Sequence, residues 1–264
     1  MEETNQTIEK PSGGSKWLVV GGIVVVAIAL FAYLRSQSTP PLAPATSQQV
    51  VKGSSVEVKF GNHIQMGLPE QDVFVEDEKN ATQVWRVEGD AQKNLDTAIQ
   101  NKTVYAAASA IDHDPFKVGA NPLGPFSKGE SLGFTMAQWM GATGGGTYTV
   151  DGDSAQLLLS FQKLVANGVY TVWCSRLTLP PNVKIEDFPC GAADGSENSF
   201  TADASGNGSF TLTLPPLAES SKETVTVIAL AYHSDGKTYG GSPGDFGMSS
   251  HVQLAFLMPA PVGQ

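Results

Sequence analysis

Hydrophobic and polar residues alternate along most of the chain from about residue 55 onward. Val56, Val58 and Phe60 alternate with polar neighbours, and further runs are rich in β-branched and aromatic residues. A period of two indicates half-buried strands, and the runs span residues 103–110, 147–150, 156–161, 169–176, 209–214, 224–232 and 252–257. Turn-forming pairs such as Asp151-Gly152 and Asn167-Gly168 stand between them. The pattern predicts a mainly β protein, most simply an immunoglobulin-like β-sandwich.

Two segments have helical spacing instead. In residues 90–101 and 131–141 the apolar side chains recur at intervals of three and four residues, which places them on one face of a helix. Asp90 and Ser131 are the expected N-caps, and Gly141 is the expected end of the second helix. We therefore expect one β domain over residues 55–264 that carries two short helices.

An uncharged apolar run covers residues 17–34, WLVVGGIVVVAIALFAYL. At about 1.5 Å per residue a helix of this length spans roughly 27 Å, close to the thickness of the bilayer interior. Trp17 and Tyr33 stand near its ends, where amphipathic aromatic side chains favour the headgroup region, and Lys16 and Arg35 flank it. The run predicts a transmembrane helix.

The foldable part of the chain all follows this run, which is why we place it outside the membrane. Residues 1–16 form the expected short polar cytoplasmic tail, and residues 35–54 form a stalk rich in Pro, Ser and Thr. Ala43-Pro44-Ala45 resembles a signal-peptidase site, but it lies far beyond Leu34. An uncleaved anchor with an extracytoplasmic C-terminal domain is the prediction, and the membrane is its first predicted partner.

Cys174 and Cys190 are the only cysteines in the chain. A single pair within a β-rich domain is typical of a structural disulfide in an oxidising compartment. The pair predicts a disulfide that closes a short loop.

Histidine and methionine suggest a metal site. If the strands at 224–232 and 252–257 pair as a hairpin, His233 and His251 meet at the same rim, and Met248 lies between them. Imidazole and thioether ligands suit copper, and this set is the alternative hypothesis, a membrane-tethered metal-binding or electron-transfer domain. His63 with Met66, and His113, are weaker candidates. No cysteine lies beside these residues as a blue-copper site requires, so hydrogen bonding that fixes the loop is the competing interpretation.

Two other motifs are weaker evidence for a functional site. Gly240-Gly241-Ser242-Pro243-Gly244 has the letters of a serine-hydrolase elbow, but Pro243 and a following strand replace the helix that the elbow requires. Asp203, Ser205 and Asn207 begin a calcium-loop pattern whose closing acidic position is Leu214. We assign no catalytic or cofactor-binding residue.

Charge excludes one class of partner. The chain has 16 Lys and Arg against 26 Asp and Glu, a net charge of −10, and no basic patch for a nucleic-acid backbone. We expect a binding or structural surface protein whose protein or glycan ligands contact the long loops at 112–128, 179–199 and 234–250.

Overall fold

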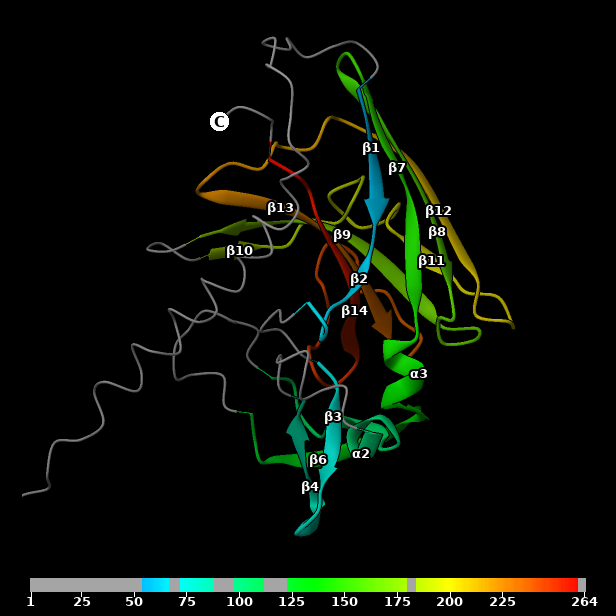
Figure 1. Ribbon diagram of the computed structural model, residues 1–264, viewed down its shortest axis with the longest axis vertical. Coiled ribbons are helices and arrows are strands. Elements are labelled where there is room, and N and C mark those ends of the chain that lie inside the picture. The colour runs from blue at the N-terminus through cyan, green and yellow to red at the C-terminus, as the bar shows by residue number, and fades with distance from the viewer. Residues whose placement is uncertain (1–53, 67–71, 88–96, 112–122, 180–183, 261–264) are drawn as a thin grey trace, which may run out of the picture. The chain divides into compact units, whose positions relative to one another are not determined.

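The computed structural model describes residues 54–66, 72–87, 97–111, 123–179 and 184–260 (Figure 1). The predicted tail, membrane helix, most of the stalk, His113 and residues 90–96 of the first predicted helix lie outside these ranges. None of the helices in the described ranges has the length and apolar character needed to cross a membrane.

The first sheet has four antiparallel strands in the order β1-β7-β8-β12. They are β1 (Ser54–Lys59), β7 (Thr143–Asp151), β8 (Ser154–Gln162) and β12 (Gly208–Leu214). Burial alternates strictly along β8, where Ala155, Leu157, Leu159 and Phe161 point inward. The alternation seen in the sequence is therefore the two-sidedness of this sheet.

The second sheet is built around β9 (Val169–Thr178), β13 (Thr224–His233) and β14 (Ser250–Leu257). Its order is β10-β9-β13-β14-β2, with β10 at Lys184–Glu186 and β2 at Gly61–Asn62, and β11 (Ser199–Thr201) also pairs with β9. The register between β13 and β14 shifts after Leu230. All of these pairings are antiparallel.

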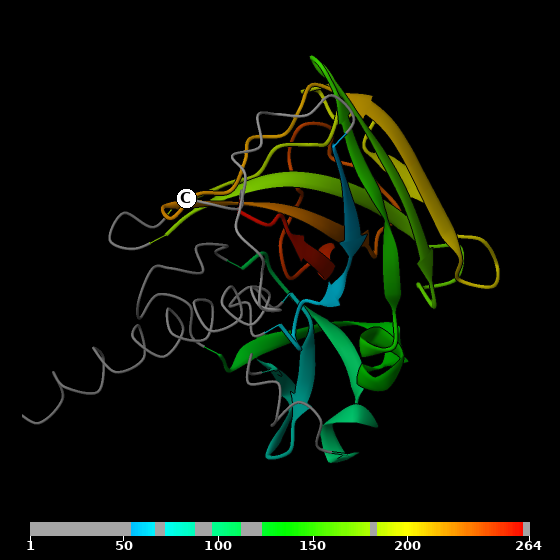
Figure 2. The ribbon, with the colours of Figure 1, turned by 45° about the horizontal axis from the view of Figure 1, so that its top comes forward.

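The two sheets share one hydrophobic core, which is where most of the apolar surface of the domain is removed from water. Leu157 and Phe161 of the first sheet and Val172, Ile228 and Leu230 of the second belong to the same buried cluster. Figures 1 and 2 show the strands of the two sheets running in different directions across this core.

Four further strands close on themselves as a small barrel: β3 (Phe74–Asp77), β4 (Asn80–Arg86), β5 (Thr103–Ala107) and β6 (Phe126–Thr135). Phe74, Val84 and Ala107 fill its interior. Gly129 is required in β6 because a Cβ there would lie 2.5 Å from the backbone oxygen of Ala107.

The structure confirms a mainly β fold and corrects the predicted helix at 131–141. Residues up to Thr135 belong to β6, and the helix α3 covers only Met136–Met140. Thr135 caps this helix instead of Ser131, because Gln138 three residues later completes a capping box with it. The other helix, α2, is described at Thr97–Gln100. Strands β3, β4 and β6 were not predicted.

Candidate binding pocket

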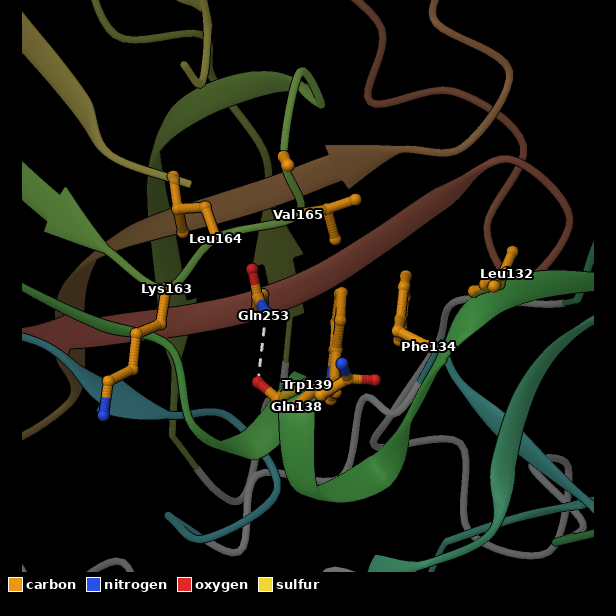
Figure 3. A pocket seen from close by; sticks show the side chains of 10 residues that line it. Leu132, Phe134, Gln138, Trp139, Lys163, Leu164, Val165 and Gln253 are labelled. Atoms are coloured by element: carbon orange, nitrogen blue, oxygen red, sulfur yellow. Dashed lines mark hydrogen bonds between the residues drawn. The ribbon is translucent and has the colours of Figure 1, made fainter. Parts of the chain in front are cut away.

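A cavity of about 360 Å³ opens between α3, the β8–β9 loop and β14 (Figure 3). Three chain segments far apart in sequence form its walls. The lining residues are Leu132, Gly133, Phe134, Gln138, Trp139, Lys163, Leu164, Val165, Ala166 and Gln253.

The capping box of α3 sets the position of the aromatic wall. The backbone N–H of Thr135 donates to Oε1 of Gln138 at 2.8 Å, and the N–H of Gln138 donates back to Oγ1 of Thr135 at 3.3 Å. A helix this short depends on its cap, since few internal hydrogen bonds hold it. The cap thereby fixes the turn that carries Trp139, which is 1% exposed.

Three aromatic rings meet behind this wall. Phe134 stacks on Trp139 with ring centroids 5.4 Å apart, and Tyr232 contacts both rings edge-on at 6.0 and 6.2 Å. Such pairs contribute about 0.5–1.5 kcal/mol each beyond the area they bury. The aromatic wall is therefore a rigid part of the core.

A buried hydrogen-bond chain ties the remaining walls together. The N–H of Val165 donates to the hydroxyl of Tyr170 at 2.8 Å, this hydroxyl donates to Oε1 of Gln253 at 3.2 Å, and Nε2 of Gln253 donates to the backbone oxygen of Trp139 at 3.0 Å. Figure 3 shows the last of these bonds as a dashed line. Burial raises the pKa of the Tyr170 phenol far above its ordinary value, so the hydroxyl remains a donor.

Backbone conformation and hydrogen bonds also fix the β8–β9 loop. Lys163 and Asn167 both adopt φ of 57°, the left-handed region that makes a tight reversal. The N–H of Leu164 donates to the oxygen of Gly206 at 2.9 Å, and that of Gly168 to the oxygen of Val165 at 3.0 Å. These contacts mean that the cavity exists before any ligand binds.

A second, smaller cavity of about 230 Å³ lies beside the disulfide. Cys174 of β9 and Cys190 are bonded, as predicted, with their Cα atoms 5.0 Å apart. Phe188, which is 47% exposed, and the prolines at 189, 215 and 216 contribute to its walls.

His251, a predicted metal ligand, is fully buried and both of its ring nitrogens are hydrogen-bonded. Nδ1 lies 2.6 Å from the backbone oxygen of Asp72, and Nε2 lies 2.9 Å from Oγ of Ser234. A carbonyl oxygen only accepts, so Nδ1 carries the proton and Nε2 accepts from the Ser234 hydroxyl. Burial lowers the pKa of His251 and keeps the ring neutral.

His233 is 1% exposed. Its Nε2 lies 2.7 Å from Oγ1 of Thr171, which also accepts a hydrogen bond from Nε1 of Trp173 at 2.7 Å. The Thr171 oxygen has two lone pairs, so it can donate to Nε2 of His233 or accept from it, according to the tautomer of the ring, and Nδ1 of His233 is buried with no hydrogen-bond partner among the described residues. Burial lowers the pKa of His233 to about 4.

The hairpin forms as predicted, but the two imidazoles point to opposite sides of the sheet. Tyr232 is paired with His251, and His233 is paired with Ser250. Directly paired residues share a face and successive residues alternate, so His233 and His251 are on different faces. Met248 lies 43% exposed in the loop between the strands.

The metal hypothesis consequently stays a prediction. Within the described ranges, no cluster of three or more His, Cys, Asp or Glu residues could hold a metal ion. His63, the other described histidine, is 3% exposed.

The residues of the two weaker sequence motifs, Ser242 and Asp203, both lie in loops. Ser242 lies exposed in the loop that joins β13 to β14, two paired strands, where a nucleophile elbow would require a strand and then a helix. The Asp203 carboxylate accepts from the N–H groups of Ser205 and Asn207, both at 2.8 Å, and so fixes its own turn.

Sequence reasoning missed the cavity. Trp139 was expected on the apolar face of the predicted helix, Phe134 lay within the same segment without an assigned role, and Lys163 and Gln253 carried no local signal. The available hint was Thr135 with Gln138, a capping-box pair that lies between Phe134 and Trp139 in the sequence.

No protein-family model, no curated protein and no solved structure matches this chain.

Proposed function

We propose that this chain is a single-pass, membrane-anchored surface protein whose extracytoplasmic β domain binds a small ligand in the cavity beside α3. The apolar run at 17–34 supports the anchor, and the disulfide between Cys174 and Cys190 supports an oxidising compartment for the domain. The two antiparallel sheets with a common core support the finer description as an immunoglobulin-like β-sandwich, which we include in the proposal.

The cavity is the observation on which the binding function rests. Its volume of about 360 Å³ is within the range of about 300–1,000 Å³ that small-molecule sites occupy. Apolar side chains make most of its wall, a few polar groups interrupt them, and the hydrogen bonds through Tyr170 and Gln253 fix that wall in advance. A preformed site reduces the entropy lost on binding.

The chemistry of the lining favours binding over catalysis. Among the described residues that line the cavity, none has a carboxylate, an imidazole, a hydroxyl or a thiol side chain. Acid–base and nucleophilic mechanisms depend on such groups. Lys163, two glutamines and the indole N–H of Trp139 are the polar side-chain groups of the described residues that line it.

The test is a fragment screen by ligand-observed NMR on the full chain in phospholipid nanodiscs, with empty nanodiscs as the blank. The variant Ala166→Trp fills the cavity mouth, and Ala81→Trp places the same side chain at an exposed position of β4. We expect fragments whose binding is lost in Ala166→Trp and kept in Ala81→Trp. Fragments that bind both variants equally, or none that bind at all, would overturn the proposal.

A further inference from the structure

Three acceptor atoms of the cavity wall already accept hydrogen bonds from within the chain. The backbone oxygen of Trp139 accepts from Nε2 of Gln253 at 3.0 Å and from Nδ2 of Asn62 at 3.4 Å. Oε1 of Gln253 accepts from the Tyr170 hydroxyl, and the oxygen of Val165 accepts from the N–H of Gly168. Each of these oxygens therefore has at most one lone pair left for a donor on a ligand.

Gln138, at the cavity mouth, likewise has a bonded acceptor, but its donor group is unbonded. Its Oε1 faces the backbone N–H of Thr135 at 2.8 Å, and because that group only donates, the assignment of oxygen and nitrogen in the amide is fixed. The Nε2 group, with two N–H bonds, has no partner among the described residues. Gln138 is exposed and therefore offers donors to anything in the mouth.

Two further donors complete the set. Nε1 of Trp139 is buried and has no hydrogen-bond partner in the described part of the chain. Lys163 is exposed at the rim, and no salt bridge joins it to a described carboxylate. Figure 3 shows its side chain at the edge of the cavity, opposite Phe134 and Leu132. Its ammonium is a cation in a chain whose net charge is −10.

From these donors we infer that the cavity recognises a small organic carboxylate with an apolar body. The apolar part would contact Phe134, Leu164 and Val165, and the carboxylate would accept from Gln138 and Lys163 at the mouth, since Nε1 of Trp139 is fully buried. A carboxylate is a pure acceptor, and charge-assisted hydrogen bonds are about twice as strong as neutral ones. This inference rests on the proposed binding function and specifies its ligand.

The first measurement compares three probes of nearly equal size: 3-phenylpropionate, its neutral amide and the cation 3-phenylpropylamine. Dissociation constants are measured by calorimetry on the full chain in nanodiscs. The carboxylate is expected to bind about tenfold or more tightly than the amide, and the amine is expected to bind most weakly.

The variant Gln138→Glu replaces the donor group at the mouth with an acceptor and keeps the helix cap. Its carboxylate can still accept from the N–H of Thr135, but it offers a negative charge where the wild type offers two N–H groups. We expect about tenfold weaker binding of 3-phenylpropionate, with the amide changed little. Gln156→Glu adds the same charge on the exposed face of β8 and is the control. Lys163→Gln should weaken the carboxylate a few-fold and reduce its salt dependence.

The outcomes separate this inference from the proposed function. If the screen finds fragments that Ala166→Trp excludes, but amide and carboxylate bind equally and Gln138→Glu changes neither, the binding function stands and the carboxylate inference is wrong. Preference for the amine, or no detectable binding of 3-phenylpropionate to a chain that binds other fragments, would also overturn it. Selective loss of carboxylate binding in Gln138→Glu supports it.

Discussion

The cavity beside α3 and the histidine-containing end of the β13–β14 hairpin both combine buried polar groups with aromatic rings, yet they differ in whether an unbonded donor is exposed: Gln138 and Lys163 at the cavity mouth are exposed, whereas His233 and Ser250 are buried. At the hairpin, both nitrogens of His251 and Nε2 of His233 have partners within the chain, whereas Nδ1 of His233 and Oγ of Ser250 are buried and have none among the described residues. At the cavity, Nε1 of Trp139 and Nε2 of Gln138 have none among the described residues. Satisfied groups stabilise the fold, whereas exposed unsatisfied donors are available to a ligand. This difference is why the cavity, and not the histidine pair, is the proposed site.

The largest expected effect is on the hairpin. His251→Ala removes a fully buried ring together with its hydrogen bonds to the Asp72 oxygen and the Ser234 hydroxyl. The cavity and the two lost hydrogen bonds together should lower the free energy of unfolding by about 4 kcal/mol. Urea unfolding followed by circular dichroism measures this loss. A change below about 1 kcal/mol would mean that His251 is not the structural residue described here.

The pH dependence of stability should come next in size. An unfolded histidine binds a proton below about pH 6.5, whereas folded His233 has a pKa of about 4. Protonation between these values favours the unfolded state, so stability is complete above pH 6.5, falls as the pH drops toward 4 and then levels off. The loss should approach about 3 kcal/mol, and burial of His251 acts in the same direction.

Urea unfolding at a series of pH values from 7.5 to 4 tests this dependence. His233→Gln should remove the part of the slope that comes from His233, because glutamine is neutral throughout, and leave the part that comes from His251. Acidic residues with lowered pKa values, such as Asp77 and Asp203, become protonated mainly below this pH window. They therefore contribute little to the slope within it. An unchanged slope in His233→Gln would contradict the assignment.

Ser234→Ala should cost about 2 kcal/mol, because it leaves Nε2 of His251 buried without a donor. Chemical denaturation at pH 7.5 measures this cost. Combining Ser234→Ala with His251→Ala should cost little more than His251→Ala alone, since both changes break the same hydrogen bond. Full additivity of the two changes would contradict the hydrogen bond.

The strands of the hairpin could be predicted from the sequence, whereas the cavity could not, and the reasons are physical. Alternation made β8 and β12 recognisable, because one face of each is apolar. Strands β9, β13 and β14 are buried along most of their length and were recognisable from their β-branched and aromatic residues. The pairing of β13 with β14 also places His233 and His251 at the same end of one hairpin. A shift of one residue in register exchanges the faces, and residues 234–249, which link the paired strands, do not specify that register.

The cavity was beyond such reasoning because its wall comes from tertiary contacts. Phe134, Lys163 and Gln253 are neighbours only after three segments fold together. Leu132 and Met136, four residues apart, imitated one face of a helix although the chain changes from β6 to α3 between them. Short apolar runs are ambiguous in this way, and pairing of β6 with β4 and β5 decided the outcome.

A smaller effect concerns the capping box. Gln138→Ala removes the acceptor for the N–H of Thr135 and should lower stability by about 1 kcal/mol. Gln138→Glu keeps an acceptor at that place and should retain wild-type stability while it weakens binding of 3-phenylpropionate. Thermal unfolding of both variants measures the first effect. Equal melting temperatures for Gln138→Ala and Gln138→Glu would show that the cap contributes nothing.

The smallest expected effect is the sharpest test of the difference between bonded and unbonded groups. Ser250 is fully buried opposite His233, and its Oγ has no partner among the described residues. Ser250→Ala removes this hydroxyl without breaking a hydrogen bond, so the free energy of unfolding should stay within about 0.5 kcal/mol of the wild type or rise slightly. Ser234→Ala, the same substitution at a bonded hydroxyl nearby, is the matched comparison. A loss at Ser250 as large as that at Ser234 would mean that a buried water satisfies the Ser250 hydroxyl, and the end of the hairpin would then hold no unsatisfied hydroxyl at this position.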